Sequence, residues 1–464
     1  MDAGMTFDME FDAVVVGAGG CGLTAAIALH DRNPQASIAV LDKAERACGN
    51  TVLSSGSIPA AGTRFQAHAG VHDTPDMFQE DLLSVAGEHE AMHLTRALTE
   101  TSARLVEWLV DSANVRLTLV ETYKHIGHRV HRLHSPPSRR GADLIDDLLR
   151  ECERRGIPVA WSNAVTELIT DEGQVVGVVC KTPDGETTRI AARHVVLASN
   201  GYAANRSLLQ RFAPEVAQAP YGGGTGSEGE ALLWGEALGA GLANMKAYQC
   251  HASLADPHGS LVTWTVVEKG GFVVDRSGRR FGDESMGYSA FAALELQRPG
   301  PFWVVADTRV RDVTAAGQEE YAELVQHGGV FEGALSDVGT RLGIDAEGLG
   351  DTLAQVRRCA SGEPDPFGRT QWGLGPLGEQ LAITRIGPAI FHTQGGLRVD
   401  IDGRVQAADG GIIPGLWAGG GAASGISGNK GSLGYMSGNG LLAALGLGLR
   451  IGEAIASQMK TAEA

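Results

Sequence analysis

One tyrosine stands among small residues in the stretch FGDESMGYSAF, residues 281–291. The chain has seven tyrosines in 464 residues, and this one, Tyr288, has glycine, serine, methionine and alanine as its nearest neighbours. A phenol in such surroundings can pack with its hydroxyl hydrogen-bonded, or it can move a proton during a reaction. An ordinary phenol has a pKa of about 10, so it is a base at neutral pH only where a neighbouring donor or positive charge lowers that value.

A glycine motif near the N-terminus predicts a dinucleotide-binding turn. In FDAVVVGAGGCGLTAAIALH, residues 11–30, an apolar strand leads into Gly17, Gly19 and Gly22 and then into an alanine-rich helix. In this G-x-G-x-x-G motif the first glycine makes the turn, the second admits a diphosphate, and the third lets helix pack on strand. A second apolar strand, SIAVLDK, ends in Asp42, about 20 residues after the last glycine, where an acid binds ribose hydroxyls.

The segment that follows resembles the fumarate reductase and succinate dehydrogenase flavoprotein superfamily, which also contains the 3-ketosteroid dehydrogenases. Residues 48–62, CGNTVLSSGSIPAAG, resemble the segment that wraps FAD in those proteins. Residues 195–212, 224–240 and 391–425 resemble later family segments in the same order. Covalently flavinylated members have a histidine where this chain has Asn50, so the resemblance implies FAD bound without a covalent link.

The motifs and the resemblance together assign a set of residues to FAD. One position departs from the family: many members carry glutamate where this chain has Gly421, so a polar contact to the cofactor is expected to be missing. The expected FAD-binding residues are Gly17, Gly19, Gly20, Gly22, Asp42, Lys43, Asn50, Thr51, Ser55, Gly56, Val165, Ala198, Ser199, Gly201, Glu228, Gly420, Asn439 and Gly440.

The order of these segments predicts an α/β protein with a discontinuous, Rossmann-like FAD-binding domain. This domain is expected to span residues 1–240 and 382–464, with an α+β capping domain inserted at 241–381, and the substrate is expected where the cap meets the flavin. Residues 165–199 alternate with a strand period and predict a small hairpin sheet. Residues 270–285 predict another hairpin that turns at Ser277-Gly278, and acidic helices are expected around 318–357.

The resemblance also implies a role for the opening tyrosine. In fumarate reductases a proton-donating arginine follows an RF-x-x-E turn, and Tyr288 holds that place here. The glutamate and arginine of their proton relay are replaced by Trp264 and Val267. Ketosteroid dehydrogenases have a tyrosine after an F-x-x-E-S turn in their acid/base pair. Tyr288 is therefore expected to handle a proton beside a ketone, although a packing role stays open.

Three further side chains are expected at the reacting centre, and for each a purely structural role is the alternative. His392 matches a histidine that holds a substrate carboxylate in fumarate reductases, and it could equally bind a ketone oxygen. His251 resembles a second histidine on the substrate side. Tyr435 stands where the family has a carboxylate-binding arginine, in an expanded glycine-rich loop in which Lys430 competes for the same role.

These substitutions favour a neutral carbonyl substrate, because a desolvated carboxylate without a cation costs several kcal/mol. The leading hypothesis is an FAD-dependent dehydrogenase that desaturates a cyclic ketone at the α,β carbons. A first rival is a reductase of an unsaturated or dicarboxylic acid, in which Lys430, Arg385 or Arg132 replaces the missing arginines. A second rival is a flavin carrier without activity of its own. Without a C-x-x-C-H heme motif, electrons are expected to pass to or from a separate partner.

Composition limits the other partners. A formal charge of −17 argues against nucleic acid, because no basic excess neutralises phosphates. The six scattered cysteines, the acidic start and a C-terminal apolar run broken by charges favour a cytoplasmic protein off the membrane. In KHIGHRVHRLH, residues 124–134, four histidines recur every third position, but no metal is expected; Arg129 or Arg132 there could instead reach the substrate.

Overall fold

The computed structural model describes residues 6–122 and 124–463. The chain forms two compact units. Unit 1 consists of Met1–Ala217, Gly223–Tyr248 and His392–Ala464, and unit 2 of Gln218–Gly222 and Gln249–Phe391. The chain passes from unit 1 to unit 2 after Tyr248 and returns after Phe391, close to the domain boundaries predicted at 240 and 381. The assignment of FAD binding to one part and of capping to the other stays a prediction.

The main sheet of unit 1 has a parallel centre extended by antiparallel strands. Its strands are β1 (Met9–Val16), β2 (Ile38–Leu41), β6 (Val159–Ala160), β7 (Ala164–Asp171), β8 (Gln174–Lys181), β9 (Thr187–Leu197), β17 (Arg404–Gln406) and β18 (Ile412–Ala418). The order is β17-β18-β9-β1-β2-β6, with β18, β9, β1, β2 and β6 parallel. The last four residues of β1 are all buried, as expected for a parallel strand covered on both faces.

The hairpin sheet predicted for residues 165–199 is confirmed. β7 pairs with β8 and β8 pairs with β9, both antiparallel. The two turns fall at Glu172-Gly173 and Asp184-Gly185, and Glu172 has the positive φ of 47° that such a tight turn requires.

Helices complete unit 1. They are α1 (Gly20–Arg32), α2 (Asn50–Leu53), α3 (Arg64–His68), α4 (Pro75–Ala86), α5 (Met92–Asp111), α6 (Gly141–Arg154), α7 (Arg206–Phe212), α8 (Glu230–Ala237) and α15 (Asn439–Glu463). Short strands β3 (Ile58–Pro59), β4 (Thr118–Leu119) and β5 (Leu133–Ser135) form one small sheet, and β10 (Leu242–Ala243) pairs with β16 (Gly396–Leu397). Single 3₁₀ turns are η1 (Pro214–Val216), η3 (Gly420–Ala422) and η4 (Gly431–Gly434).

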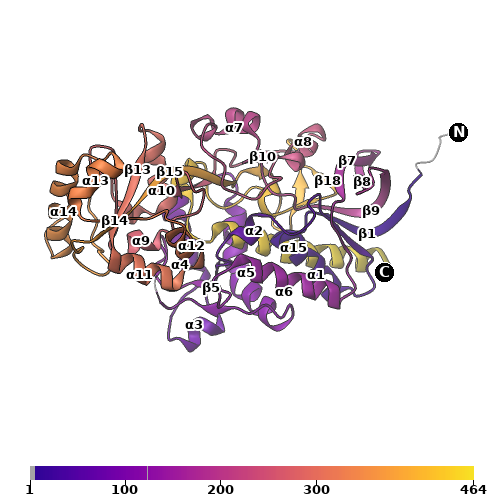
Figure 1. Ribbon diagram of the computed structural model, residues 1–464. Coiled ribbons are helices and arrows are strands. Elements are labelled where there is room, and N and C mark those ends of the chain that lie inside the picture. The colour runs from indigo at the N-terminus through magenta and orange to yellow at the C-terminus, as the bar shows by residue number, and fades with distance from the viewer. Residues whose placement is uncertain (1–5, 123, 464) are drawn as a thin grey trace. The chain divides into compact units, whose positions relative to one another are not determined.

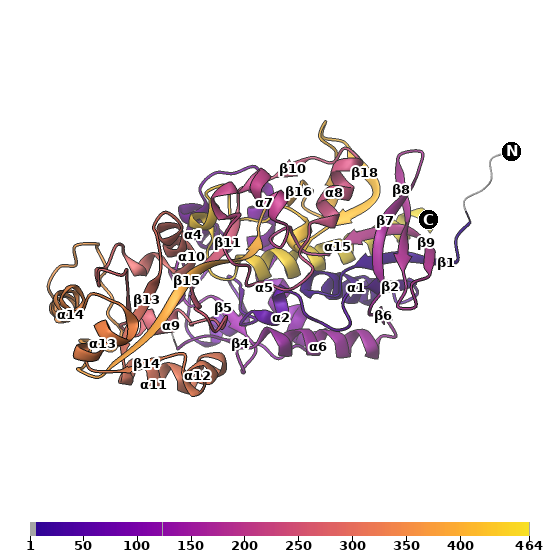
Figure 2. The same ribbon diagram turned by 45° about the horizontal axis from the view of Figure 1, so that its top comes forward.

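The first and last helices pack directly on each other. α1 contacts α15 on one side and α6 on the other (Figures 1 and 2). A Cβ added to Gly452 would lie 2.4 Å from the Ala25 carbonyl oxygen, and one added to Gly448 would lie 2.6 Å from that of Cys21. These glycines therefore allow the two backbones to approach closely.

α15 is apolar because it is a core helix. Within the described residues, Asn439–Thr461 has the length and hydropathy of a membrane span, but 61% of its most apolar window is buried inside the molecule. A burial of this kind is the pattern of a helix that packs in a protein core.

Unit 2 is built around a second sheet. Its strands are β11 (Tyr248–Ala255), β12 (Phe272–Val274), β13 (Phe302–Asp307), β14 (Phe331–Gly333) and β15 (Leu381–Thr393), in the order β11-β15-β13-β12 with β14 beside β15. The helices are α9 (Thr265–Glu268), α10 (Tyr288–Leu296), α11 (Thr308–Gly317), α12 (Glu319–Gln326), α13 (Leu335–Leu342) and α14 (Ala346–Ala360), with the 3₁₀ turn η2 (Glu284–Met286). The acidic helices predicted around 318–357 are confirmed.

The hairpin predicted for residues 270–285 is wrong. A turn does form at Asp275–Arg279, but β12 pairs with the distant β13, and residues 280–283 form no strand. The reason is the side chain of Glu284, whose buried ion pairs fix the chain after the turn in another direction.

Candidate active site

The predicted diphosphate turn has the geometry that the glycines imply. Gly17 follows β1 with φ of 112°, and α1 begins at Gly20. A Cβ on Gly22 would lie 2.0 Å from the Gly17 carbonyl oxygen, so helix and turn pack there without space for a side chain. A Cβ on Gly19 would meet nothing within 4 Å. The turn therefore packs tightly against the helix at Gly22 and leaves space beside Gly19, where a diphosphate can approach the backbone.

The predicted ribose acid is held in place by backbone donors. Asp42 directly follows β2, and its carboxylate accepts the N–H of Ala18 at 2.8 Å and that of Ala44 at 2.9 Å. Each carboxylate oxygen has a further lone pair, so the group can still accept ribose hydroxyls. The neighbouring Lys43 instead pairs with Glu228 and Glu230 on the segment that opens α8.

The segment that follows Asp42 is hydrogen-bonded to two other segments predicted to bind the cofactor, at residues 200 and 224. Asn50 begins α2; its amide nitrogen donates to Asn200 at 3.3 Å, and its amide oxygen accepts the N–H of Gly224 at 2.7 Å. Both ends of this amide thus join the three motif segments. Of the other predicted residues here, Thr51 packs on Gly20, Ser55 bonds Ser57, and Gly56 takes a positive φ of 67° beside Pro136.

Two of the predicted FAD residues have a buried polar atom without a hydrogen-bond partner among the described residues: the hydroxyl of Ser199 and the amide oxygen of Asn439. Ser199 follows β9 by two residues, and Asn439 begins α15. A buried polar group without a partner costs about 1–3 kcal/mol. Both residues are predicted FAD contacts, and a bound cofactor with hydrogen-bonding groups can satisfy them.

The packing around Gly421 explains why this chain lacks the glutamate that many family members carry at that position. Gly421 lies in η3, and a Cβ added there would lie 2.6 Å from the Gly201 nitrogen and 2.6 Å from the Asn200 amide oxygen. A glutamate cannot take this place without moving the backbone after β9. The remaining predicted residues Val165, Ala198, Gly201, Glu228 and Gly420 also lie in unit 1.

Unit 1 also contains a histidine–tyrosine pair. His392 and Tyr435 meet edge to face, with ring centroids 5.5 Å apart at 72°. The amide nitrogen of Gln394 lies 3.1 Å from Nδ1 of His392, and Ser427 donates to the oxygen of that amide at 3.2 Å. A Cβ on Gly440 would lie 3.1 Å from the imidazole, so the ring packs against the first turn of α15. Burial lowers the pKa of His392 to about 4, so the ring is neutral at physiological pH.

Unit 2 contains a second pair. His251 on β11 and Tyr288 at the start of α10 are stacked, with ring centroids 4.5 Å apart at 13°. Trp264 and Phe391 also contact the His251 ring, each with a centroid distance of 6.1 Å. Burial lowers the pKa of His251 to about 3. The predicted residues of this group are thus brought together in an aromatic cluster within unit 2.

The hydrogen bonds of His251 define its tautomer. Its Nδ1 lies 3.2 Å from the backbone N–H of Ser253, which can only donate. The Ser253 hydroxyl, which lies 3.0 Å from the same Nδ1, gives its proton to the Val262 carbonyl at 2.7 Å. Nδ1 is therefore the acceptor, and the proton of the neutral ring is on Nε2. His251 is a fixed N–H donor whose orientation is set by Ser253, a residue that the sequence analysis missed.

A buried ion cluster fixes the chain just before Tyr288. Glu284 is fully buried and accepts hydrogen bonds from Arg280 at 2.6 Å and from Arg369 at 3.4 Å. It also accepts the N–H of Val273 at 3.1 Å. Arg280 additionally pairs with Asp365. Sequence reasoning used Glu284 only as a landmark, and the partner arginine 85 residues away left no local signal.

The cations that the acid-reductase rival needs are engaged elsewhere. Arg132 is completely buried and bonds Asp73 at 2.7 Å and Asp81 at 2.8 Å. The ammonium of Lys430 lies 3.4 Å from the Val85 carbonyl, near the C-terminus of α4. The expectation that Arg132 or Arg129 reaches a substrate is therefore not supported, because Arg129 also binds Asp81.

Arg385, the third cation, lies on β15 in unit 2. It pairs with Asp256 at 2.8 Å, and both side chains are about half exposed.

The histidines at 125–134 have separate partners. His128 donates from Nε2 to the Ser437 carbonyl at 2.9 Å, and His134 bonds the Thr63 hydroxyl at 2.9 Å. Among the residues that the structure describes, no group of three or more histidine, cysteine, aspartate or glutamate side chains could hold a metal ion.

Comparison with known proteins agrees with this geometry. Residues 12–435 match the family described as FAD binding domain. The chain is 30% identical over 431 residues to NADH:fumarate oxidoreductase of Klebsiella pneumoniae (strain 342), a match that covers 91% of this chain and 45% of that protein. The chain thus spans about half the length of that relative.

Two solved structures show the same fold. The open conformation of a flavocytochrome c3 fumarate reductase has a TM-score of 0.81 at 25% identity, covering 97% of this chain and 78% of that one. The 3-ketosteroid-Δ4-(5α)-dehydrogenase from Rhodococcus jostii RHA1, in complex with 4-androstene-3,17-dione, has a TM-score of 0.76 at 23% identity, covering 98% of both chains. The chain therefore belongs to the FAD binding domain family, in the flavoprotein superfamily of the fumarate reductases, and FAD is its cofactor.

Proposed function

We propose that the protein is an FAD-dependent dehydrogenase that desaturates a ketone, with cyclic ketones as the natural class, at its α,β carbons. FAD supplies the two-electron acceptor for the hydride that leaves the β-carbon. Tyr288, as the phenolate, takes the proton from the α-carbon, so that loss of one proton and one hydride leaves a carbon–carbon double bond. His251, a neutral N–H donor, and Tyr435 are the groups proposed to hold the ketone oxygen, together with His392.

The observation that carries this proposal is the pair in unit 2. A phenol, not a guanidinium, begins α10 and stacks on a histidine whose proton is on Nε2. The rings around His251 are those of Trp264 and Phe391. Aromatic walls of this kind suit a flat, uncharged substrate better than a dianion, which requires paired cations when it leaves water.

The position of Tyr288 supports an ionised phenol in part. It is the first residue of a nine-residue helix, where the helix dipole stabilises negative charge by about 0.3–1 kcal/mol. Ionising an ordinary phenol at pH 7 requires about 4 kcal/mol, since its pKa is about 10. The helix therefore offsets only a fraction of this cost, and the remainder adds to the barrier for proton abstraction.

A second candidate is a reductase of an unsaturated acid. The relative with 30% identity is named for fumarate, and this favours an acid substrate. Against it stands Arg132, which is buried and paired with two aspartates, whereas Lys430 and Arg385 keep N–H donors beside their partners. In this alternative the same FAD would deliver hydride to the double bond, and the electrons would come from a separate donor.

Anaerobic mixing distinguishes these functions. The FAD-loaded protein is mixed with cyclic ketones, 3-ketosteroids and saturated dicarboxylic acids, and the loss of flavin absorbance is followed. Bleaching by a ketone, slowed at least a hundredfold in Tyr288→Phe, is the expected result.

Two other results would replace the proposal. Bleaching by succinate alone, or reoxidation of the reduced flavin by fumarate alone, would establish the acid reductase. No spectral response to any compound, with Tyr288→Phe silent, would establish a carrier without activity of its own.

A further inference from the structure

The loop that carries Tyr435 runs from Gly425 to Gly438 and has little regular structure. It contains five glycines, and its helical part is the 3₁₀ turn η4. Glycine lets the backbone bend freely but supplies no side chain that could hold the loop in one place. The position of Tyr435 therefore depends on the contacts that this loop makes with neighbouring elements of unit 1.

Hydrogen bonds in both halves of the loop join it to other parts of unit 1. In the first half, the ammonium of Lys430 donates to the Val85 carbonyl, in the last turn of α4, at 3.4 Å. In the second half, Nε2 of His128 lies 2.9 Å from the carbonyl oxygen of Ser437, which can only accept. The bond from His128 reaches the loop two residues after Tyr435, so it holds the part of the backbone that bears this side chain.

Arg132 fixes which nitrogen of His128 carries the proton. Nη1 of Arg132 lies 3.2 Å from Nδ1 of His128 and 2.8 Å from a carboxylate oxygen of Asp81, and its two hydrogens serve these two acceptors. A guanidinium can only donate, so Nδ1 is an acceptor and the ring proton is on Nε2, toward Ser437. Burial lowers the pKa of His128 to about 4, and the charge of Arg132 acts in the same direction. The neutral imidazole is therefore a donor with one orientation.

The arginine that orients His128 is itself held firmly. Its Nε and Nη2 donate to the two carboxylate oxygens of Asp73 at 2.7 and 2.8 Å, and both side chains are fully buried. Its guanidinium carbon lies 4.5 Å from the ring centroid of Phe78, which belongs to α4 as Asp81 does. A buried charge that loses its partner is strongly destabilising, so this group keeps its arrangement. Both hydrogen bonds of the loop thus lead to α4, one directly and one through Arg132.

We propose that His128 is a positioning residue for Tyr435. Its Nε2–H, oriented by Arg132, holds the carbonyl of Ser437 and with it the part of the glycine-rich loop that presents the Tyr435 hydroxyl. This inference rests on the proposed function, in which Tyr435 helps to hold the ketone oxygen. The histidine-rich stretch of residues 124–134 then acts on the substrate indirectly, through one hydrogen bond to the loop.

Two substitutions separate the two hydrogen bonds of His128. In His128→Asn the amide oxygen takes the place of Nδ1 and can accept from Arg132, but the donor to Ser437 is lost. In His128→Gln the longer side chain places an amide N–H near the former Nε2, so the donor to Ser437 is kept. His128→Asn is therefore expected to release the loop, and His128→Gln is expected to retain it.

Hydrogen exchange of the FAD-loaded protein, followed by mass spectrometry, measures this release without any substrate. The backbone N–H groups of Leu433, Tyr435 and Asn439 are hydrogen-bonded to carbonyls of residues 430–436 and report on the loop. In His128→Asn, residues 430–439 are expected to exchange about fivefold faster, as for the loss of one hydrogen bond, whereas His128→Gln should match the wild type. Unchanged exchange in His128→Asn, or equally fast exchange in both variants, would overturn the inference.

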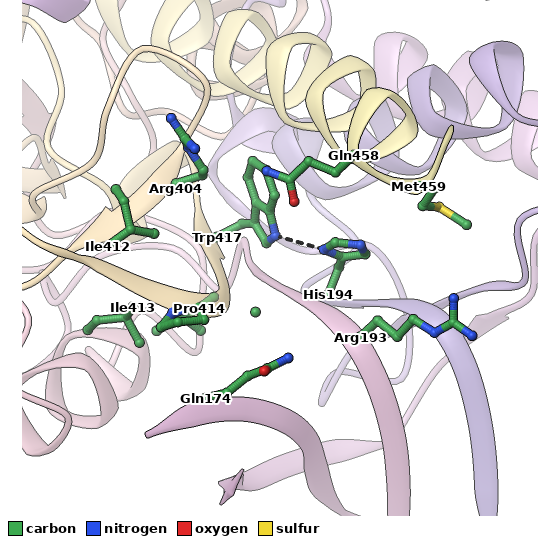
Figure 3. A pocket seen from close by; sticks show the side chains of 12 residues that line it. Gln174, Arg193, His194, Arg404, Ile412, Ile413, Pro414, Trp417, Gln458 and Met459 are labelled. Carbon is green, nitrogen blue, oxygen red and sulfur yellow. Dashed lines mark hydrogen bonds between the residues drawn. The ribbon is translucent and has the colours of Figure 1, made fainter. Parts of the chain in front are cut away.

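His194 on β9 provides a matched control. Its Nδ1 accepts the indole N–H of Trp417 at 3.3 Å, so a group that can only donate fixes its tautomer, as in His128. Figure 3 shows this pair at a cavity of about 430 Å³, which Gln458 also lines, about 28 Å along α15 from Asn439 at 1.5 Å per residue. His194→Asn is therefore expected to leave the exchange of residues 430–439 unchanged. Faster exchange there would mean that the loss of any such histidine loosens the loop, and it would also overturn the inference.

The link to the substrate is tested by combining His128→Asn with Tyr435→Phe. His128→Asn alone is expected to slow flavin reduction by ketone about fivefold, and His128→Gln is expected to restore the rate. In the Tyr435→Phe background His128→Asn should cause no further loss, because it acts through the hydroxyl that is already absent. Independent losses would overturn the positioning role. If no ketone reduces the flavin of the wild type, the proposed function fails, and hydrogen exchange still decides whether His128 holds the loop.

Discussion

The two histidine–tyrosine pairs use the same residue types in different surroundings. In unit 2 the rings of His251 and Tyr288 are stacked within an aromatic cluster, and a buried ion cluster fixes the preceding turn. In unit 1 the rings of His392 and Tyr435 meet edge to face, and neutral amide and hydroxyl groups support the histidine. The loop of Tyr435 contains five glycines between residues 425 and 438.

This difference indicates a division of labour. A group that takes a proton from carbon must be held at a set distance and angle, because small displacements reduce the rate strongly. Tyr288 has the stronger fixation, since it begins a helix and follows the ion cluster of Glu284. A group that only donates a hydrogen bond to a substrate oxygen tolerates the softer support around Tyr435. We therefore propose that Tyr288 takes the proton, with His251 as the hydrogen-bond donor beside it, and that Tyr435 helps to orient the substrate.

The largest expected effect is on the rate of flavin reduction when the hydroxyls of Tyr288 and Tyr435 are removed in separate variants. Tyr288→Phe is expected to lower the rate of flavin reduction by ketone by 10²–10⁴, the usual loss of a general base. Tyr435→Phe removes one hydrogen-bond donor and is expected to lower the rate about tenfold, since such a bond contributes about 0.5–1.5 kcal/mol. Stopped-flow absorbance measures both rates. Equal losses in the two variants would remove the distinction between the pairs.

The next effect concerns the frame of unit 2. Glu284→Gln leaves Arg280 and Arg369 without their shared carboxylate, and breaking a buried ion pair in this way costs about 3–5 kcal/mol of unfolding free energy. The control is Arg279→Gln, whose partner Asp351 is as exposed as Arg279 itself, so about 0–1 kcal/mol is expected. Urea unfolding of the FAD-loaded protein provides both values. A loss below 1 kcal/mol in Glu284→Gln would show that the cluster does not fix this turn.

The sequence alone predicted some features of the fold and the site better than others. Local patterns predicted the turn at Gly17, the acid at Asp42 and the β7–β8–β9 hairpins, because each depends on residues close in the chain. Tyr288 and His251 were predicted from resemblance, and the structure brings their rings together. Their supporting contacts could not be predicted: Arg369 is 85 residues from Glu284, and no periodicity reports such a pairing.

Two predictions failed for the same reason. Residues 270–285 have the turn signal of a hairpin, but β12 pairs with β13, and the buried ion pairs of Glu284 hold the chain after the turn. Arg132 lies in a histidine-rich stretch that looks reactive, but two aspartates from residues 73 and 81 neutralise it in the core. A charged side chain that looks available in a sequence is often half of a buried pair, and its partner is visible only in the fold.

A third expected effect compares the histidines by pH. Burial lowers the pKa of His251 to about 3 and that of His392 to about 4, both below the unfolded value of 6.5. The unfolded chain therefore binds protons first, and stability present above pH 6.5 is lost as the pH falls toward these values. Each such histidine removes up to about 1.4 kcal/mol per pH unit in this window.

Replacement by asparagine tests the difference. His251→Asn and His392→Asn are each expected to reduce the slope of unfolding free energy between pH 6.5 and 4.5. In the wild type both histidines contribute over this range, and below pH 4 only His251 still contributes. Unfolding curves at several pH values measure the slopes. Slopes equal to that of the wild type would mean that the imidazoles are already charged or exposed in the folded protein.

The last expected effect concerns a second buried glutamate of unit 2, whose carboxyl lacks the arginine partners that Glu284 has. Glu295 lies on the same helix as Tyr288, is 1% exposed, and neither carboxyl oxygen has a hydrogen-bond partner among the described residues. Burial raises its pKa well above the ordinary value, so the proton is retained and stability falls as the pH rises toward the folded-state pKa. Glu295→Met fills a similar volume without the unpaired polar atoms and is expected to raise the unfolding free energy by about 1–3 kcal/mol at pH 7.5, and by less at pH 4.5. Because Glu295 lies two turns from Tyr288, flavin reduction by ketone should change less than twofold. A Glu295→Met protein that is as stable as the wild type but reduces its flavin slowly would place this carboxyl in the proton path of α10.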